Sequence, residues 1–300
     1  MTAPQTGIFA LGTHAHSYLE LCLNDGADPR ATLAIAAGLS EPRTTMGGVN
    51  LVLGFRPELW ASVMPDHSPA GLAGFNAPVV GPDGFTMPAT QHDIFLWTAG
   101  GSRDVVFDTA TAIIDAFAGH ATVADEVSGW TYHRDRDLTG FIDGTENPHL
   151  SEAPRRVLVR RGTPGAGGSV LLVQKWRHEA DKWNALTVPE QEMAMGRTKP
   201  DSVELDDRPD TSHVARTDQD DFGKIFRRNT PFGSAREHGT MFVGFCDRQG
   251  PLAGMIASMA GLSGGVRDAL TLYTTPMTGA YYFIPSLDDL AVLAPPEDGE

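Results

Sequence analysis

The residues best able to do chemistry begin with Asp143, which lies in the run Gly140-Phe-Ile-Asp-Gly-Thr-Glu-Asn-Pro148. Glycines on either side of this aspartate let a ligand approach the backbone closely, and Pro148 ends whatever element precedes it. The run therefore predicts a carboxylate that is presented to a ligand. A hairpin turn of the Asp-Gly type, without any function, explains the same spacing and is the commoner reason for it.

Two further groups of residues could act together with such a carboxylate. His213 lies in an acidic loop, where a lone histidine is most often a solvated side chain. Arg227 and Arg228 follow an Ile-Phe step and precede Asn229. Paired arginines are usually surface charge, but after two hydrophobic residues in a strongly acidic protein they favour a buried or anion-facing guanidinium.

Composition restricts the class of partner. The 300 residues carry a formal net charge of −15, which argues against nucleic acid and anionic membranes as partners. Cys22 and Cys246 are the two cysteines, so the sequence indicates neither a zinc cluster nor a disulfide framework. The N-terminus lacks the features of a signal peptide, and no apolar run is long enough to span a bilayer. We therefore expect a cytoplasmic, globular protein with a small-molecule partner.

The first half of the chain alternates strands and helices that could position these residues. Strands are expected over residues 6–11, 17–23, 50–55, 93–98 and 123–134, and helices over 29–38 and 103–118. From residue 17 onward the order is β-α-β-β-α-β, which is typical of a ferredoxin-like unit.

The second half repeats this theme. Strands are expected over residues 155–160, 169–175, 240–247 and 280–285, and helices over 188–197 and 252–262. The glycine-rich loop 162–168 leads into a strand and lacks a Lys-Ser/Thr ending, so it predicts a flexible hairpin and not a phosphate cradle. The fold class that follows is α+β, with two ferredoxin-like lobes of antiparallel sheet over residues 1–135 and 136–300.

Several motifs together give the chain a resemblance to a known family. The successive motifs of the dye-decolorizing peroxidases resemble four runs of this sequence, in the same order: Gly140-Phe-Ile-Asp-Gly-Thr-Glu-Asn-Pro148, Gly196-Arg-Thr-Lys199, Thr211-Ser-His-Val-Ala-Arg216 and Arg227-Arg-Asn-Thr-Pro-Phe-Gly233. Residues 239–245 and 278–286 are similar to the C-terminal strands of that family. The resemblance covers nearly the whole second half, and the compact length is similar to that of the bacterial B-type branch.

The resemblance implies a fold of the dimeric α/β-barrel-like superfamily and one haem b per chain, bound in the second lobe. His213 would be the axial ligand of the haem iron, and its other ring nitrogen needs a hydrogen-bond acceptor. Family members often have an acid where this chain has Leu272. Asp268, four residues earlier, is the acceptor that we predict, with a backbone carbonyl or a water as the alternative.

On the opposite, distal side of the haem, the resemblance implies that Asp143 and Arg227 face hydrogen peroxide. Asp143 would accept a proton from one peroxide oxygen and donate it to the other, while Arg227 would stabilise the developing negative charge. Asn229 would orient water or peroxide. Further contacts to the haem are expected from Arg197 and Arg228, at its carboxylates, and from Gly144, Thr240 and Phe242. Solvent exposure is the alternative for Arg228.

The implied function is reduction of hydrogen peroxide coupled to oxidation of dyes, phenols or other small organic reductants, by a homo-oligomeric enzyme. An aspartate with an ordinary pKa acts as a base only above pH ~4, and haem peroxidases oxidise organic reductants best in acid, which predicts an optimum at roughly pH 4 to 6. Electron relays for large reductants could come from several aromatic residues, although packing is the commoner role of such residues: Trp130, Tyr132, Trp176, Trp183, Tyr281 and Tyr282.

Two other classes of function compete with this one. A protein that binds or dechelates haem without turning over peroxide would keep His213 but would not need both Asp143 and Arg227. A hydrolase without haem would need a nucleophile elbow or an HExxH zinc motif, and the sequence contains neither. The joint presence of Asp143 and Arg227 favours the peroxidase.

Overall fold

The computed structural model describes residues 2–39, 48–133 and 136–293. Its main feature is a ten-stranded sheet with the order β11-β7-β12-β2-β5-β1-β6-β9-β10-β8. The strands of this sheet are β1 (Ala15–Leu23), β2 (Asn50–Phe55), β5 (Ile94–Gly100), β6 (Ala121–Trp130), β7 (Ser169–His178), β8 (Phe226–Arg227), β9 (Thr230–Gly233), β10 (His238–Cys246), β11 (Thr274–Pro276) and β12 (Ala280–Ile284). A small separate sheet pairs β3 (Val79–Val80) with β4 (Thr86–Met87).

The large sheet closes on itself. Strand β7 pairs with β12 on one side and with β10 on the other, so the ring β12-β2-β5-β1-β6-β9-β10-β7 has no open edge. Each recorded pairing is antiparallel, which confirms the predicted α+β class with antiparallel sheets. Closure into a barrel satisfies the backbone groups that an edge strand would leave unpaired.

The barrel is assembled from two halves of the chain that meet at two seams. Strands β1, β2, β5 and β6 come from the first half, and β7, β9, β10 and β12 come from the second. One seam is the pairing of Phe283 with Phe55, and the other is the pairing of Gly129 with Phe232. A side chain at Gly129 would place its Cβ 2.5 Å from Thr230 Oγ1, so the second seam needs glycine. The predicted lobe boundary lies between residues 135 and 136. Residues 134 and 135 are outside the described part of the chain, so the boundary stays a prediction.

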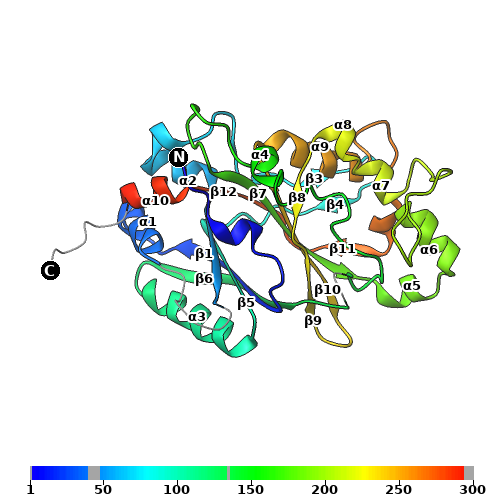
Figure 1. Ribbon diagram of the computed structural model, residues 1–300, viewed down its shortest axis with the longest axis horizontal. Helices are drawn as coiled ribbons and strands as arrows, with labels where there is room; N and C mark the ends of the chain where they lie inside the picture. Colours follow the sequence, from blue (N-terminus) through cyan, green and yellow to red (C-terminus); the bar gives the residue numbers. More distant parts are fainter. Residues whose placement is uncertain (1, 40–47, 134–135, 294–300) are drawn as a thin grey trace.

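Helices pack on the outer faces of the barrel (Figure 1). The helical segments are α1 (Pro29–Ala37), α2 (Pro57–Val63), α3 (Arg103–Ala116), α4 (Ala153–Val157), α5 (Ala180–Asn184), α6 (Val188–Met195), α7 (His213–Arg216), α8 (Gln219–Phe222), α9 (Gln249–Met259) and α10 (Leu287–Leu293), with 3-10 turns η1 (Thr6–Phe9), η2 (Pro65–His67) and η3 (Ala269–Leu272). Helices α1, α2, α3 and α10 bury apolar side chains against one part of the sheet, and α9 packs against β7 and β10. None of the described helices has the length and apolar character needed to cross a membrane.

Most predicted elements are confirmed, and two predicted strands are wrong. The helices predicted over residues 29–38, 103–118, 188–197 and 252–262 correspond to α1, α3, α6 and α9, and the remaining strands correspond to β1, β2, β5, β6, β7, β10 and β12. The strand predicted to continue to Arg134 ends at Trp130, and Arg134 itself lies outside the described residues.

The two wrong strands lie at residues 6–11 and 155–160, where the structure has η1 and α4. In the first case, the side chain of Gln5 replaces a strand beside β2: its amide accepts from Leu53 N at 2.7 Å and donates to Leu53 O at 2.9 Å. In the second case, Pro154 lies in the first turn of a helix, a position that suits its fixed φ. The alternation of apolar residues in the sequence reveals neither the contact between Gln5 and Leu53 nor the start of the helix that contains Pro154.

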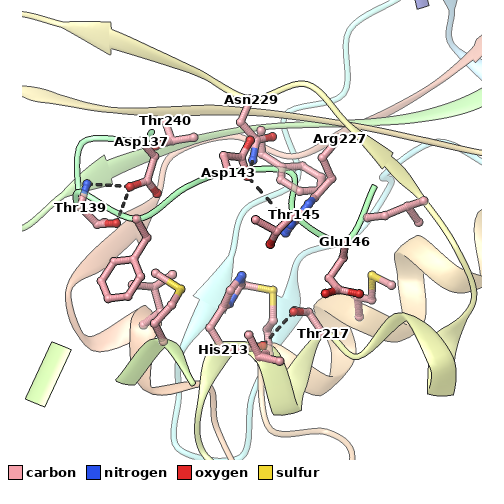
Figure 2. Close-up of a pocket in the computed structure, with 18 of the residues that line it drawn as sticks. Asp137, Thr139, Asp143, Thr145, Glu146, His213, Thr217, Arg227, Asn229 and Thr240 are labelled. Carbon is pink, nitrogen blue, oxygen red and sulfur yellow. Dashed lines mark hydrogen bonds and ion pairs between the residues drawn. The ribbon is translucent and has the colours of Figure 1, made fainter. Parts of the chain in front are cut away.

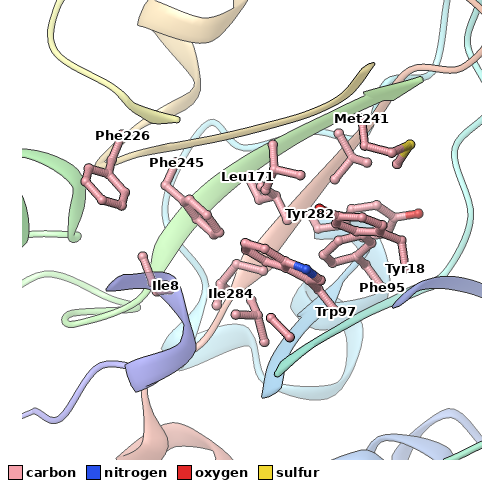
Figure 3. Close-up of a cluster of buried hydrophobic side chains, with 14 of the residues drawn as sticks. Ile8, Tyr18, Phe95, Trp97, Leu171, Phe226, Met241, Phe245, Tyr282 and Ile284 are labelled. Atoms are coloured by element: carbon pink, nitrogen blue, oxygen red, sulfur yellow. The ribbon is translucent and has the colours of Figure 1, made fainter. Parts of the chain in front are cut away.

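The barrel interior is filled mainly by aromatic side chains (Figure 3). Trp97 stacks on Tyr18 with ring centroids 5.5 Å apart, and Phe95 stacks on Tyr282 at 5.3 Å. Side chains alternate between the two faces of each strand, so β1 places His16, Tyr18 and Glu20 in the barrel interior. These polar groups are satisfied within the barrel.

The side chains of His16, Tyr18 and Glu20 each have a partner from another strand. Trp97 Nε1 donates to His16 Nδ1 at 3.2 Å, Tyr18 Oη lies 2.9 Å from Thr230 Oγ1, and Tyr282 donates its hydroxyl to the carboxylate of Glu20. Burial raises the pKa of Glu20 to about 7, although the hydrogen bond from Tyr282 acts in the opposite direction. The native protein therefore holds a proton at Glu20 over a pH range in which an unfolded chain has released it.

We expect Glu20→Gln to remove a pH-dependent loss of stability. Because the folded pKa is raised, the contribution of the protonated glutamate to stability is complete below pH ~4.5 and is lost as the pH rises through 7. The free energy of unfolding of the wild type, relative to Glu20→Gln, should fall by up to about 3 kcal/mol between pH 5 and pH 8. Urea unfolding at both pH values measures this difference. Glu126→Gln, at an exposed position on β6, is the control and should show no such trend.

Candidate active site

A cavity lies against the outer face of β7 and β10, on the side that α9 covers. Strand alternation explains its wall: Leu172 and Thr240 face the cavity, while their neighbours Val173 and Met241 point into the barrel. Apolar side chains from the strands and from α9 form one side of the wall: Leu172, Trp176, Phe242, Leu252, Met255, Ile256 and Met259. The cavity is therefore a slot with apolar sides and polar groups at its two faces.

His213 forms one face of the slot, which is the lower one in Figure 2. It is the first residue of α7, and Ser212 caps this helix by accepting a hydrogen bond from Ala215 N at 3.3 Å. His213 Nδ1 lies 2.7 Å from Asp268 Oδ2, so a carboxylate at Asp268 accepts a hydrogen bond from Nδ1–H. Within the described residues, Nε2 has no hydrogen-bond partner, which leaves this nitrogen available to a ligand.

Asp268 is completely buried, and it also caps η3 by accepting a hydrogen bond from Leu270 N at 2.8 Å. The structure thus brings together the histidine and the carboxylate that the sequence analysis paired. Asp268 is the N-cap of η3, whereas Leu272 lies exposed at the far end of this 3-10 turn. Two neighbours hold the carboxylate in place, so the ring of His213 has a fixed orientation.

Asp143, Arg227 and Asn229 form the opposite face of the slot (Figure 2). Asn229 Nδ2 donates to Asp143 Oδ1 at 3.1 Å, and Arg227 Nη2 lies 4.0 Å from the same oxygen. Arg227 Nε is buried, and in the described part of the chain it has no partner. Asp143 Oδ2 likewise accepts no hydrogen bond from the described residues. Both groups can therefore still bind a small polar molecule in the slot.

Asn147, to which the sequence analysis gave no role, fixes this face. Its side-chain amide donates to Arg227 O at 2.8 Å and accepts from Arg227 N at 2.8 Å. This pair of bonds ties the loop that carries Asp143 to strand β8. The signal in the sequence was a short amide side chain within the same motif, a type that readily bonds to backbone groups.

Arg197 and Arg228, the two arginines predicted to bind ligand carboxylates, occupy different places. Arg197 lines the slot, and its guanidinium contacts Glu146 Oε1 at 2.5 Å and Glu204 Oε2 at 3.2 Å. Arg228 does not line the slot; it points into the barrel and lies 4.3 Å from the ring centroid of Trp97. Arg228 points into the barrel because side chains alternate along the strand, and its neighbours Arg227 and Asn229 occupy the outward positions.

A second cavity lies on the other side of the loop that carries Asp143. Gly144 lines this cavity and not the slot, and its φ of 74° explains why glycine occurs there. The two cavities share a wall of five side chains, namely Asp137, Asp143, Arg227, Asn229 and Thr240. Thr240 and Phe242, both predicted to contact a ligand, do line the slot.

Asp137 is the titratable residue of the shared wall that sequence reasoning missed. Its Oδ1 accepts hydrogen bonds from the backbone N of Thr139, at 2.8 Å, and from the hydroxyl of the same residue. Burial raises the pKa of Asp137 to about 6, and the nearby charge of Asp143 acts in the same direction. His178, elsewhere in the slot, has its pKa lowered to about 4 by burial. The available signal for Asp137 was its position six residues before Asp143 in one loop.

Comparison with known proteins identifies close relatives. The family models described as Dyp-type peroxidase, N-terminal, and Dyp-type peroxidase, C-terminal, match residues 20–131 and 134–289. A dye-decolorizing peroxidase from Mycolicibacterium paratuberculosis is 35% identical, and the match covers 94% of this chain and 84% of that protein.

Solved structures agree with the sequence comparison. A variant of DypB from Rhodococcus jostii RHA1, in complex with heme, is 34% identical with a TM-score of 0.88, covering 97% of this chain and 99% of that one. A dye-decolorizing protein from V. cholerae is 32% identical with a TM-score of 0.87, covering 95% and 98% of the two chains.

The geometry at Asp268 predicts different stability losses for two substitutions. Asp268→Ala removes both the cap of η3 and the acceptor for His213, and should lower the free energy of unfolding by about 2–3 kcal/mol. Asp268→Asn retains an oxygen for the cap and should cost less. Asp28→Ala, which removes only a surface cap of α1, is the control and should cost about 1 kcal/mol. Urea unfolding of the three variants tests this order, and equal losses for Ala and Asn would contradict it.

Proposed function

The chain belongs to the Dyp-type peroxidase family and is a peroxidase, and on this basis we propose that it binds one haem b through His213 and reduces hydrogen peroxide with Asp143 and Arg227. The electrons come from dyes, phenols or other small organic reductants, best at acidic pH. The observation that carries this proposal is the position of His213 Nε2 on one face of the slot, with Asp143 and Arg227 on the other (Figure 2). We also propose that it works in the cytoplasm as a homo-oligomer.

The residues of the slot fit a haem group. A flat, largely apolar macrocycle suits the apolar side walls, and a single imidazole nitrogen without a partner suits one axial position of the iron. The carboxylate of Asp268 at Nδ1 makes His213 a more basic ligand. When bound, haem would supply the iron that binds peroxide and the electrons that break its O–O bond.

Arg197 is the residue that we propose for a haem carboxylate. Its present partners, Glu146 and Glu204, both have exposed carboxylates, and ion pairs of this kind contribute little stability in water. A ligand carboxylate can therefore displace one of them or share the guanidinium. Arg197 itself is largely buried and donates to Ser202 O at 2.9 Å, so its position at the edge of the slot is fixed.

Asp143 is the proposed base, acting through Oδ2. Its Oδ1 accepts a hydrogen bond from Asn229, which leaves Oδ2 free to act as the base. Oδ2 would accept a proton from one peroxide oxygen and return it to the other, departing oxygen. The same group serves both transfers, so no proton has to enter the slot for this step. The amide of Asn229 holds the carboxylate in one orientation, because its own oxygen accepts from Val243 N at 3.2 Å.

Arg227 is the proposed electrostatic partner of Asp143. Its backbone is held by Asn147, and its buried Nε has no partner among the described residues. A preorganised donor of this kind stabilises negative charge on the departing oxygen without reorganisation during the reaction. Arg227 remains charged at every relevant pH and therefore cannot replace Asp143 as the base.

We expect His213→Ala to lose the axial ligand. The purified wild type, loaded with haem, should show a Soret band whose position changes in the variant, and the affinity for haem should fall at least tenfold. Absorption spectra and haem titration of the apoprotein measure both effects. His149→Ala is the control, since His149 lies outside the slot, and an unchanged Soret spectrum in His213→Ala would overturn the assignment.

Substitutions on the opposite face should slow the reaction with peroxide more than they weaken haem binding. Asp143→Asn keeps the bond to Asn229 but removes the base, and should slow this reaction by about 10²–10⁴-fold. Arg227→Leu should slow it by about 10²–10³-fold. Stopped-flow mixing of the haem-loaded protein with hydrogen peroxide measures these rates. Glu152→Gln, at an exposed site in the same loop region, should react like the wild type.

A protein that only binds haem would give a different result. It would keep the Soret band of the wild type but would react slowly with peroxide, whatever residue stood at position 143 or 227. Oxidation of guaiacol by the wild type at pH 5, followed in the same samples, separates the enzyme from such a carrier.

A further inference from the structure

We propose that Asp137 is a proton-holding residue of this site, which passes protons to Asp143 during turnover and regains them from water in the second cavity. This inference rests on the proposed role of Asp143 as the group that exchanges protons with peroxide. Asp137 acts through Asp143 and does not itself contact peroxide, so it is a positioning residue and not a catalytic one.

The position of Asp137 is the first argument. Its side chain lines both the slot and the second cavity, as do those of Asp143 and Arg227 (Figure 2). Its Oδ1 is held by Thr139, and in the described part of the chain its Oδ2 accepts no hydrogen bond. One oxygen therefore fixes the side chain and the other remains available to carry a proton.

The backbone around Asp137 fixes this position. Asp137 N donates to Phe141 O at 3.0 Å, and Gly140 N donates to Asp137 O at 3.0 Å. The neighbouring Arg136 donates to Gly140 O at 2.7 Å and to Lys199 O at 2.9 Å. These bonds fix the turn from Asp137 to Phe141, and the bridge between Arg136 and Ile142 places Asp143 directly after it.

The surroundings of Asp137 favour its protonated form. Burial is the largest cause of its raised pKa, and the charge of Asp143 adds to it. The hydrogen bonds from Thr139 and the charge of His213 oppose this effect but do not cancel it. The other charged or titratable side chains that line the two cavities come from several elements: Arg136, Glu146 and His149 from the same loop region, Arg227 and Arg228 from β8 and the residue after it, His178 from β7, His16 from β1, Tyr132 from the segment after β6, and Arg197, Glu204, His213, Asp218 and Asp220 from the segment that runs from the end of α6 into α8. His16 and His178 are neutral near pH 5, because burial lowers the pKa of His16 to about 3 and that of His178 to about 4.

The stoichiometry of the reaction supplies the need for such a residue. Reduction of one hydrogen peroxide to two waters takes up two electrons and two protons. Each phenolic reductant gives one electron and releases its proton to the solvent, so two protons must return to the site. In each return step, the O–H bond of protonated Asp137 breaks as an O–H bond forms on the carboxylate of Asp143. A proton that the reductant released to the solvent then reaches Asp137 through water in the second cavity and restores its O–H bond.

The test compares Asp137→Asn with the wild type in the haem-loaded enzyme. Asparagine keeps the acceptor oxygen for Thr139 but cannot release a proton. With guaiacol as reductant and saturating peroxide, the wild-type rate should fall as the pH rises through about 6. The variant should be at least tenfold slower at pH 5 and nearly independent of pH between 5 and 7. Its stopped-flow reaction with peroxide should stay within about twofold of the wild type, because Asp143 is intact.

Two further variants keep the proposal testable if Asp137→Asn binds haem poorly. Asp137→Glu restores a carboxylic acid and should restore a pH-dependent rate. Thr139→Val removes a hydrogen bond that lowers the pKa of Asp137, so the fall in rate should move to higher pH. Infrared difference spectra between pH 5 and pH 7 provide a readout other than activity. They are recorded in a Glu20→Gln background, because Glu20 also loses a proton in this range. The protein with Asp137 should show loss of a protonated carboxyl group, and the same protein with Asp137→Asn should lack that signal.

Several results would overturn the proposal. An Asp137→Asn variant as fast as the wild type at pH 5 would show that no proton passes through this residue. A variant that is fast and remains fast up to pH 8 would show that only the charge of Asp137 matters. Absence of the infrared signal from the Glu20→Gln protein would show that Asp137 holds no proton in this pH range. Failure of the proposed function is distinct, because it would appear as an unchanged peroxide reaction in Asp143→Asn, whatever the result at Asp137.

Discussion

Alternation along the strand segment from Phe226 to Gly233 is the constraint on which the site depends. Its even-numbered members, Phe226, Arg228 and Thr230, enter the barrel, whereas Arg227 and Asn229 face the slot. Both sets are fixed by the same pairing with β10, so a shift of one residue would exchange them. The core of the barrel and the proposed chemistry are therefore positioned by one register.

The barrel interior tolerates its polar residues because each is matched by a neighbour. Arg228 places its guanidinium over Trp97 and donates to backbone carbonyls of residues 7 and 10. Burial lowers the pKa of Arg228 to about 10, which leaves it charged at neutral pH, while His16 beside it stays neutral. One buried cation with full hydrogen bonding is far less costly than an unpaired one. The charge that the strand brings inside is thus compensated locally, and the register that exposes Arg227 remains stable.

The sequence predicted the parts of this arrangement that depend on local pattern. Strands such as Asn50–Phe55 have the apolar alternation of a buried sheet and were found at the expected bounds. The region around Gln5 was not predictable in this way, because its side chain bonds to Leu53, 48 residues away. The same holds in the site. The resemblance of the motifs to those of a known family indicated Asp143, His213 and Arg227, but the bonds from Asn147 to Arg227 span 80 residues and depend on tertiary structure. The inward direction of Arg228 required the register of β8.

The two aspartates of the shared wall differ because their partners differ. Asp143 accepts a hydrogen bond from the amide of Asn229, and the guanidinium of Arg227 lies 4.0 Å from the same oxygen. Asp137 has bonds only from Thr139 among the described residues, and these do not offset its burial. Two carboxyl groups in one loop repel each other when both are ionised. Unequal surroundings reduce that repulsion, because burial and the charge of Asp143 raise the pKa of Asp137 to about 6, so that Asp137 holds its proton in mildly acidic solution.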